Sequence, residues 1–480
     1  MTGEFDDPAA LTATQVLAAF RAGRLTAVAY AQALLDRCRD LAWLNAFIGG
    51  TSEALLLEAR EADNRRRRGR SAGILDGLPI VIKDNIDVAG WATTAGTPGL
   101  EEHVPDTTAP VAAALFEAGA LMLGKTNMHE LAYGITSNNG TFGPVRNPYG
   151  VRRIAGGSSG GTGTAVAARM VAAGLGTDTG GSVRIPAALC GIAGLRPTTH
   201  RYSQAGIVPI SHSRDTAGPM AQGVADIALL DGVITGESAP LETIRLKDLR
   251  LGVPRRSFFE AIEPEVLTIV EALFQRLQQA GVVLVEADPE GMRELLRDLG
   301  RAVAFHETPP DIVKYLAASG APTTFDRIVA DLGSPDVAAI FAEIIQNPVS
   351  EALYRAARDD RMPRLRSLFQ DYFARHRVAA IIFPATALTA SAIGEDEQVM
   401  LCGRPVSTFA AFLRNTEPAT LAGLPGIVLP AGRSPAEGLP VGVELDGPPG
   451  SDRRLLAIAA AIEPFLAPLP PPTPSPAQLR

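Results

Sequence analysis

Residues 78–83 carry the sequence Leu-Pro-Ile-Val-Ile-Lys, a short apolar run that is typical of a buried β-strand. Residues 111–118 then have a helical pattern, residues 120–123 form a second strand-like run, and the alanine-rich residues 166–173 predict another helix. Strands that alternate with helices indicate a parallel or mixed sheet with helices on both faces. We therefore expect the α/β class, with three α/β/α layers around a central mixed β-sheet.

Similar patterns continue on both sides of this region. Before it, amphipathic stretches predict helices over residues 11–23, 28–41 and 51–69. After it, we expect a long helix over 264–280 and buried strands over 251–254, 282–285, 379–383 and 426–429. The segment from about residue 290 to 377 is mainly helical by periodicity, which predicts a peripheral insertion. The proline-rich residues 464–480 predict an extended or disordered tail.

The composition is that of an ordinary globular protein. Of the 480 residues, 46% are hydrophobic and 20% are charged, which excludes a largely disordered, collagen-like or coiled-coil chain. The 44 basic and 52 acidic side chains give a formal charge of −8. This mild acidity argues against a protein whose main task is to bind nucleic acid or anionic lipid.

The cysteines and the first residues indicate the compartment. Cys38, Cys190 and Cys402 lie far apart and form no CxxC pair, which is typical of a reduced intracellular setting. Residues 1–7 are acidic where a secretory signal would be basic, and no apolar run reaches the roughly 18 residues that a membrane span needs. We expect a soluble, cytoplasmic protein.

One segment is unusually poor in charge and rich in glycine. From residue 154 to 195 only Arg169, Asp178 and Arg184 are charged, which is three of 42 residues against one in five for the chain. Within residues 156–194 there are 11 glycines, which allow positive φ angles and close approach of the backbone to other atoms. A buried, glycine-dense segment predicts a functional site rather than a flexible linker.

Four motif-like stretches lack the residues or the context that their function requires. Residues 119–126 match the phosphate-binding GxxxxGK[ST] pattern, but their middle residues are strand-like. Residues 129–133 have Tyr133 where a zinc-binding helix needs a second histidine. The arginines at 65–68 close the last turn of an expected helix, which predicts a solvated helix end. Residues 156–160 match GxSxG, but no apolar strand precedes them and no late histidine is placed to act as base.

Three short stretches together supply the parts of acyl-transfer chemistry: Lys83, the loop 156–161 (Gly-Gly-Ser-Ser-Gly-Gly) and the segment 176–182 (Gly-Thr-Asp-Thr-Gly-Gly-Ser). Taken singly, a lysine at a strand end usually reaches solvent and serines among glycines usually form turns. A serine nucleophile needs a base, and burial can remove the charge of a lysine so that it can serve as one. The glycines before Ser182 leave backbone N–H groups unobstructed, as an oxyanion hole requires.

These stretches, with residues 123–127 and 438–442, resemble the signature of the amidase signature family over nearly the whole chain. The resemblance implies the amidase signature fold, one domain over 1–480 with a signature core at about 74–220, and an acyl-enzyme mechanism with a Ser-cisSer-Lys triad. It makes Ser182 the nucleophile, Ser158 a proton relay on a cis peptide bond, and Lys83 the general base. It places the oxyanion hole at the backbone amides of Thr179, Gly180, Gly181 and Ser182, and it implies neither a metal nor a cofactor.

The supporting charges and the acyl pocket are also expected by resemblance. Asp178 and Arg184 are assigned to support of the site, or equally to a purely structural ion pair, because charges in so apolar a segment need partners. Residues 127–139 and 201–212 resemble the indoleacetamide and mandelamide hydrolases, which implies primary amides of aryl-substituted acids as substrates. Ala132, Tyr133 and Ile135 fall where relatives line the acyl pocket, although Tyr133 could equally be a core residue.

Three alternatives remain open at this point. The same triad could hydrolyse carbamates, anilides or esters, because it determines the reaction type but not the acyl or leaving group. The chain could be the glutaminase subunit of an aminoacyl-tRNA amidotransferase, which would need partner subunits. It could also be a binding protein with a relic site, which the presence of all three triad residues disfavours. The resemblance further implies a possible homodimer.

Overall fold

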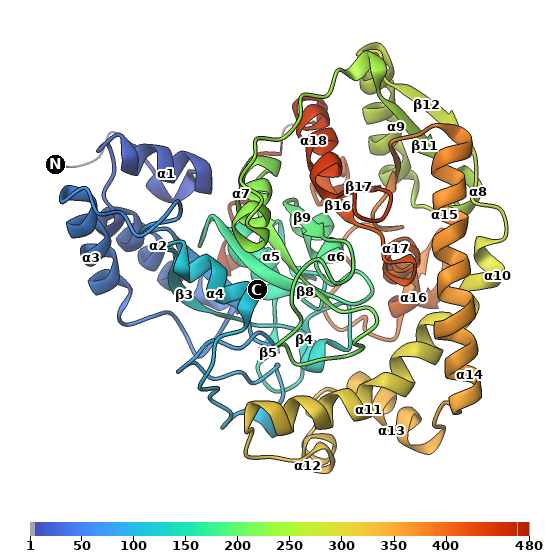
Figure 1. Ribbon diagram of the computed structural model, residues 1–480, viewed down its shortest axis with the longest axis horizontal. Helices are drawn as coiled ribbons and strands as arrows, with labels where there is room; N and C mark the ends of the chain where they lie inside the picture. Colours follow the sequence, from blue (N-terminus) through green and yellow to red (C-terminus); the bar gives the residue numbers. More distant parts are fainter. Residues whose placement is uncertain (1–4, 468, 480) are drawn as a thin grey trace.

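The computed structural model describes residues 5–467 and 469–479, and eleven of its described strands form one large mixed sheet (Figure 1). The strand order is β1-β3-β2-β8-β10-β9-β16-β17-β13-β11-β12. β2 is parallel to β3 and β8, and β11 is parallel to β12 and β13, whereas the remaining neighbours are antiparallel. The predicted α/β class with a central mixed sheet covered by helices is confirmed.

The bounds of the eleven strands in this sheet are as follows: β1 (Phe47–Ile48), β2 (Pro79–Lys83), β3 (Leu121–Thr126), β8 (Ala173–Asp178), β9 (Ala193–Arg196), β10 (Thr216–Ala221), β11 (Arg250–Val253), β12 (Val283–Glu286), β13 (Ala380–Pro384), β16 (Gly426–Arg433) and β17 (Pro440–Asp446). Three two-stranded ribbons accompany it: β4 (Asn138–Asn139) with β5 (Gly143–Pro144), β6 (Arg146–Asn147) with β7 (Gly150–Ile154), and β14 (Gln398–Leu401) with β15 (Arg404–Ser407).

The α-helices are α1 (Ala13–Arg21), α2 (Ala27–Asp40), α3 (Leu55–Arg67), α4 (Pro110–Glu117), α5 (Gly160–Ala167), α6 (Arg184–Cys190), α7 (Val224–Thr235), α8 (Arg255–Phe258), α9 (Pro264–Gln279), α10 (Met292–Leu296), α11 (Leu299–Ser319), α12 (Phe325–Ala330), α13 (Pro335–Gln346), α14 (Glu351–Arg355), α15 (Met362–His376), α16 (Thr408–Leu413), α17 (Glu417–Ala422) and α18 (Asp452–Ile462). Short 3₁₀ turns lie at 8–10, 42–44, 98–100, 130–132, 246–248, 463–465 and 476–479, and a π turn lies at 356–361. None of the described helices is both long enough and apolar enough to cross a membrane.

The helix expected over residues 166–173 is wrong in position. The chain forms α5 over Gly160–Ala167 instead, and β8 already begins at Ala173. Glycine is a poor helix former, so propensity misplaced this helix onto the alanines. Close packing decides the matter: a Cβ at Gly161 would lie 2.3 Å from the Asn127 carbonyl oxygen. α5 packs on β2 and β8, and α6 packs on β9, β16 and β17, which brings the two glycine-rich segments together.

Two of the rejected motifs now have a structural explanation. Residues 121–126 form β3, whose backbone pairs with β1 and β2, so the phosphate-loop pattern lies in a strand as expected. The arginine run does end α3, but its side chains are less free than a solvated helix end implies. Arg65 pairs with the buried Asp76 at 2.6 Å and Arg66 pairs with Asp63 at 2.8 Å.

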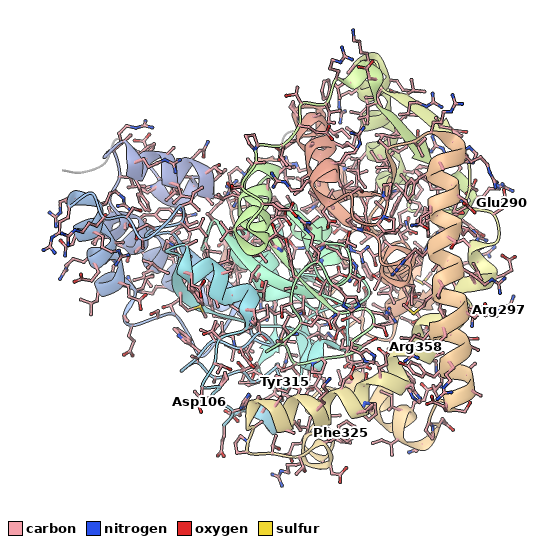
Figure 2. The ribbon with its side chains drawn as sticks, in the orientation of Figure 1. Asp106, Glu290, Arg297, Tyr315, Phe325 and Arg358 are labelled. Atoms are coloured by element: carbon pink, nitrogen blue, oxygen red, sulfur yellow. The ribbon has the colours of Figure 1, made fainter. Side chains whose placement is uncertain are left out.

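Residues 290–377 contain α10 to α15, which run along the lower and right edges of the view in Figure 1. Figure 2 shows Tyr315 near the end of α11 and Arg358 beside the lower end of α15. Tyr315 attaches α11 to the segment that follows β2, because its hydroxyl donates to Asp87 Oδ1 at 2.8 Å and bonds His103 Nε2 at 3.1 Å. Helix α11 is therefore held against the same end of β2 that carries Lys83.

The C-terminal residues lie against the body of the protein. The Tyr149 hydroxyl donates to the Pro470 carbonyl at 3.1 Å, and Arg152 Nε donates to the Gln478 carbonyl at 3.0 Å. Residues 468 and 480 of the predicted tail lie outside the described residues, as do residues 1–4 of the acidic N-terminal segment.

Candidate active site

Lys83, the last residue of β2, lies beside the end of β8 at one edge of the sheet. The two strands are parallel neighbours with Ile82 opposite Leu175, so their carboxyl ends reach the same edge. The Lys83 side chain is fully buried, and its Nζ donates to Ser158 Oγ and to Thr177 Oγ1, each at 2.7 Å. The topology thus joins a lysine and a serine that are 75 residues apart.

Burial controls the charge of this lysine. Desolvation lowers the pKa of Lys83 to about 7, although the carboxylates of Asp178 and Asp215 oppose the shift. An amine with a pKa near neutrality is unprotonated in a large fraction of molecules at pH 7, and it can then accept a proton. Asn85 Nδ2 donates to Thr177 Oγ1 at 3.1 Å, which orients the hydroxyl that receives the Lys83 N–H. The geometry and the pKa both suit a general base.

Ser158 lies two residues before the first residue of α5, and the Gly157–Ser158 peptide bond is cis. Its carbonyl oxygen accepts the His129 N–H at 3.1 Å and the Ser137 hydroxyl at 3.4 Å, so the backbone of Ser158 is held by the segment that follows β3. A Cβ at Gly157 would lie 2.9 Å from the carbonyl carbon of Ile135. Only glycine therefore lets this segment lie so close to the loop that carries the predicted acyl-pocket residues.

The turn between β8 and α6 carries Ser182 and the predicted oxyanion hole. Among the described residues, the backbone N–H groups of Thr179, Gly180, Gly181 and Ser182 donate to no protein acceptor. Gly181 has φ +155°, and a Cβ there would lie 2.2 Å from Thr416 Oγ1. Thr416 Oγ1 in turn donates to the Gly180 carbonyl at 2.6 Å. The turn therefore presents consecutive free donors on a backbone that needs glycine.

Ser182 is joined to the Lys83–Ser158 pair through the backbone. The Ser159 N–H donates to the Ser182 carbonyl at 3.1 Å, whereas the Ser182 hydroxyl bonds no other described residue. Ser182 is 7% exposed and lines a cavity. Its hydroxyl is thus available to a molecule in the cavity, while Lys83 and Ser158 lie beneath the surface.

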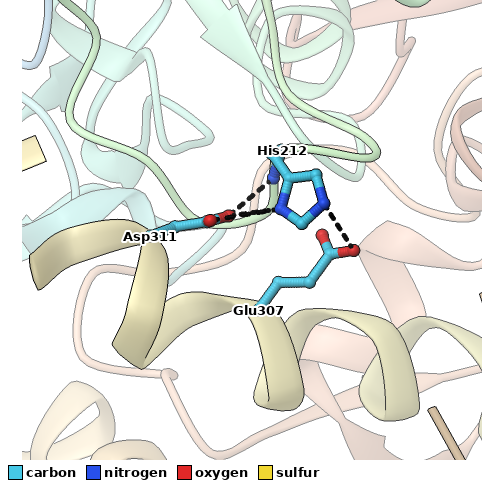
Figure 3. Close-up of side chains that lie close together, drawn as sticks. All are labelled: His212, Glu307 and Asp311. Carbon is cyan, nitrogen blue, oxygen red and sulfur yellow. Dashed lines mark hydrogen bonds and ion pairs between the residues drawn. The ribbon is translucent and has the colours of Figure 1, made fainter. Parts of the chain in front are cut away.

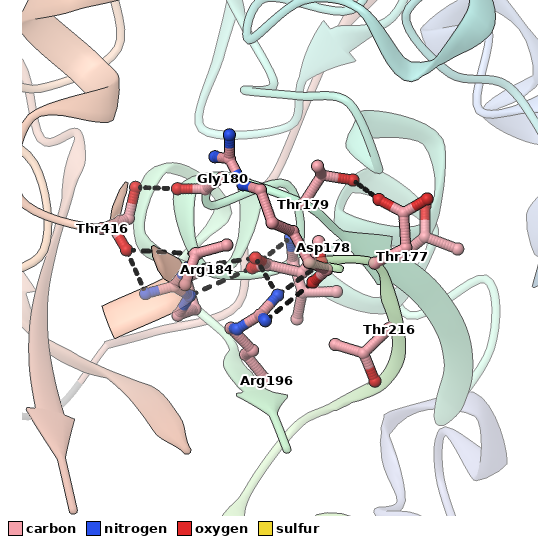
Figure 4. Close-up of polar contacts among 12 residues, drawn as sticks. Thr177, Asp178, Thr179, Gly180, Arg184, Arg196, Thr216 and Thr416 are labelled. Carbon is pink, nitrogen blue, oxygen red and sulfur yellow. Dashed lines mark hydrogen bonds and ion pairs between the residues drawn. The ribbon is translucent and has the colours of Figure 1, made fainter. Parts of the chain in front are cut away.

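Asp178 and Arg184, the two charges predicted to need partners, form a fully buried ion pair (Figure 4). Arg184 Nε and Nη2 donate to the two Asp178 oxygens at 3.0 Å each, and Arg184 Nη1 reaches Glu444 Oε1 at 2.6 Å. Arg196 Nη1 approaches Asp178 Oδ1 at 3.1 Å. Burial alone would raise the pKa of Asp178, but the two guanidinium groups outweigh it and hold that pKa well below its usual range. Asp178 Oδ2 also accepts the Val183 N–H, so the pair braces the turn at its C-terminal side.

The cavity has a volume of about 1190 Å³. All three predicted acyl-pocket residues line it together with Ser182: Ala132, Tyr133 and Ile135. Further apolar lining residues come from the loop before β10 (Ile210), from α11 (Ala304 and Phe305) and from α13 (Ile340). The segment 394–398 adds the carboxylates of Glu395, Asp396 and Glu397. Tyr133 is both a lining and a core residue, because its ring packs edge-on against Phe341 with centroids 5.2 Å apart.

Two residues at this site carried no signal in the sequence analysis. Thr177 lies inside the glycine-rich segment but has no recognisable role until Lys83 is seen to bond it. Asp215 lies in a different part of the chain, yet its carboxylate accepts the Thr179 hydroxyl at 2.6 Å. Burial raises the pKa of Asp215 to about 6. The Asp215–Thr179 contact joins residues 36 positions apart, so no local pattern could have revealed it.

His212, Glu307 and Asp311 form a second cluster of titratable groups, at the junction of the 201–215 segment and α11 (Figure 3). Asp311 Oδ2 lies 2.9 Å from His212 Nδ1, and Glu307 Oε1 lies 3.5 Å from His212 Nε2. The two carboxylates thus face opposite ring nitrogens. This is the arrangement of an ion-paired imidazolium rather than of ligands that converge on one cation, and the contact raises the pKa of His212.

The site combines a buried lysine hydrogen-bonded to a serine with a turn of free backbone amides that lies at a cavity. Sites of this type, here on the mixed sheet of an α/β fold, are found in hydrolases of acyl compounds. The Amidase family model matches residues 29–456, and the chain belongs to this family. It is a hydrolase that acts on amide C–N bonds.

Relatives and solved structures agree over nearly the whole chain. It is 43% identical to an indoleacetamide hydrolase of Agrobacterium vitis, over 90% of this chain and 92% of the relative. It is 42% identical to a mandelamide hydrolase of Pseudomonas putida, over 96% of this chain and 93% of the relative. A crystal structure of an amidase superposes with a TM-score of 0.85 and 33% identity, over 95% of this chain and 100% of the other. The resemblance to the amidase signature family is confirmed.

Proposed function

We propose that this protein hydrolyses primary amides of small aryl-substituted acids through an acyl-enzyme intermediate on Ser182. The observation that carries the proposal is the buried Lys83 amine, whose pKa is lowered to about 7 and which lies 2.7 Å from Ser158 Oγ under the cavity that Ser182 lines. A buried, neutral lysine next to a hydroxyl group can act as a base and accept the proton of that hydroxyl. The serine pair above it supplies that hydroxyl.

In the proposed reaction, neutral Lys83 takes the proton of Ser158 while Ser158 Oγ takes the proton of Ser182. Ser182 Oγ then bonds the amide carbon, and the carbonyl oxygen becomes an oxyanion held by the amides of the 179–182 turn. As the C–N bond breaks, the proton returns through Ser158 to the leaving nitrogen, so that ammonia departs neutral. Water repeats the sequence on the ester and releases the acid. Every proton moves between groups of the chain, the substrate and water.

Two observations support aryl-substituted primary amides as the substrate class. The acyl side of the cavity carries Tyr133, Ile135 and Ile210, a set of side chains that suits a flat apolar group. The relatives named above hydrolyse, by their names, an indole-bearing and a phenyl-bearing acetamide. Asp178 and Arg184 are proposed to support the turn, because Asp178 binds both Arg184 and the Val183 N–H.

Active-site labelling tests the nucleophile. A fluorophosphonate probe should label wild-type protein at Ser182, and Ser182→Ala should abolish both labelling and amide hydrolysis while the circular dichroism spectrum stays unchanged. Ser407 is the matched control, because it also lines the cavity but contacts none of the proposed catalytic groups. Ser407→Ala should keep the label, and a label that persists on another serine in Ser182→Ala would overturn the assignment.

A substrate panel tests the leaving group and the acyl group. Indole-, phenyl- and hydroxyphenylacetamide should give the highest kcat/KM, above the anilide, carbamate and methyl ester of the same acids. A higher kcat/KM for the anilide, carbamate or ester would move the assignment to that class on the same triad.

A further inference from the structure

We propose that Asp215 is a positioning residue that ties the acyl pocket to the oxyanion turn, so that the wall that holds the acyl group and the amides that hold the oxyanion move as one unit. The inference deepens the proposed function and rests on it. The groups that make the connection are the two oxygens of one buried carboxylate, which bind different segments of the chain.

The two carboxylate oxygens of Asp215 accept hydrogen bonds from different segments of the chain. Oδ1 accepts the hydroxyl of Thr179 at 2.6 Å. Oδ2 accepts the backbone N–H groups of Ile210 at 2.8 Å and Ser211 at 2.9 Å. Asp215 is only 7% exposed and directly precedes β10, whose first residue, Thr216, pairs with Asp178 at the end of β8. The carboxylate is therefore attached to the central sheet at the point where the turn begins.

On one side the connection reaches the acyl pocket. Ile210 lines the cavity, and its carbonyl accepts the Thr308 hydroxyl of α11 at 2.7 Å. The Thr308 hydroxyl is also bonded to the hydroxyl of Tyr133, which lines the same cavity. Tyr133, Thr308 and Ile210 thus form one hydrogen-bonded wall, and Asp215 holds the Ile210 end of it.

On the other side the connection reaches the oxyanion turn. Gly180 and Gly181 have no side chains, and glycine allows a wide range of backbone angles. Contacts made by neighbouring groups must therefore restrict the conformation of the turn. Thr179 supplies a side-chain anchor through Asp215, and Thr416 holds the Gly180 carbonyl. Figure 4 shows the bond of Thr179 on the side of the turn opposite to that of Thr416. Because oxyanion donors act only when they are aimed at the developing charge, loss of an anchor should lower kcat more than it changes KM.

The negative charge of Asp215 also raises the pKa of Lys83. The negative charges near that lysine are Asp178 and Asp215, and both raise its pKa. The positive charge of Arg214 lowers the pKa of Asp215 and so opposes the effect of burial. Removal of the Asp215 charge should therefore lower the pKa of Lys83 and move the acid limb of kcat/KM to lower pH, which a purely structural role would not do.

The first test separates the anchor from general packing. Thr179→Val keeps the branched shape but removes the hydroxyl, and kcat should fall about 10- to 100-fold while KM changes less than about threefold. Thr179→Ser should restore most of kcat, because it restores the hydroxyl. Thr216→Val is the control: Thr216 is a buried threonine adjacent to Asp215, but among the described residues its hydroxyl donates to the carbonyl of Ala217 and not to Asp215. A wild-type kcat in Thr179→Val, or an equal loss in Thr216→Val, would overturn the proposal.

The second test uses Asp215→Asn. With its amide oriented so that the oxygen still accepts the Ile210 and Ser211 N–H groups, the asparagine can donate to Thr179 Oγ1, so the fold should survive while the charge is lost. The acid limb of kcat/KM should then move to lower pH, and an unmoved limb would contradict the electrostatic part of the role. Fluorophosphonate labelling of Ser182 is measured in the same samples. An unlabelled wild type would refute the proposed function itself, whereas a labelled wild type with an unaffected Thr179→Val variant would refute only the role of Asp215.

Discussion

The amine of Lys83 and the hydroxyl of Ser158 lie 2.7 Å apart, and both residues are fully buried. Among the described residues no carboxylate forms an ion pair with this lysine, and Thr177 Oγ1 accepts a second hydrogen bond from its Nζ at the same distance. A lysine without an ion-pair partner in a buried site loses much of its preference for the charged form. We therefore propose that the Lys83 amine acts as the base at neutral pH.

Lys83→Met should lower kcat/KM at pH 7 by about 10²- to 10⁴-fold, the usual contribution of general acid–base catalysis. The wild-type profile should rise with pH and level off above pH 7, because the base acts when it is neutral and its pKa is about 7. The rise should be absent from the variant. Lys125→Met is the matched control, since Lys125 is also buried but pairs with Asp84 at 3.4 Å. The assignment would be contradicted if the rise of kcat/KM with pH were absent from Lys125→Met but present in Lys83→Met.

Arg184→Met should lower the free energy of unfolding by about 3–5 kcal/mol, because it removes the guanidinium that pairs with the buried Glu444 and one of the two that pair with the buried Asp178. Urea unfolding followed by circular dichroism measures the change. Arg364→Met is the comparison, since the Arg364–Asp360 pair is exposed and should change stability little. Equal effects in the two variants would argue against a structural role for the buried pair.

Gly181→Ala should lower kcat by about 100-fold or more with a smaller change in KM. The reason is steric: φ is +155° and the new Cβ would lie 2.2 Å from Thr416 Oγ1, so the turn must shift. Gly450→Ala provides a control at another positive φ, +78°, where a Cβ meets nothing within 4 Å. Steady-state kinetics should show near wild-type activity for the control, and similar losses in both variants would mean that backbone strain alone is responsible.

Tyr133→Ala should reduce kcat/KM about 10-fold or more for arylacetamides, because it removes an aromatic ring that lines the cavity and packs against Phe341. The loss should be smaller for a short aliphatic amide such as propionamide, whose acyl group cannot contact the ring. Tyr133→Phe keeps the ring and should retain most of the activity on both substrates. A uniform loss on both substrates would assign Tyr133 to the core rather than to specificity.

Much of the fold could be predicted from local patterns. The apolar run at 78–83 became β2, the helix expected over 264–280 became α9, and the strands expected over 379–383 and 426–429 became β13 and β16. These elements bury one continuous apolar stretch or stripe, so their period is visible in the sequence. The helix expected over 166–173 failed because α5 is built from glycines whose only support is close packing against other segments.

The fold class could be predicted from apolar periodicity, which is a local property of the chain, and the family from the resemblance of its short motifs. The same motifs predicted Lys83, Ser158 and Ser182 as the residues of the site. The environment of these residues depends on how distant segments pack together. The lowered pKa of Lys83 depends on desolvation by surrounding segments. The cavity combines residues near 133, 210, 305, 340 and 395, which the fold alone brings together. Asp215 meets Thr179 because β8 and β10 are antiparallel neighbours, which places the start of one beside the end of the other.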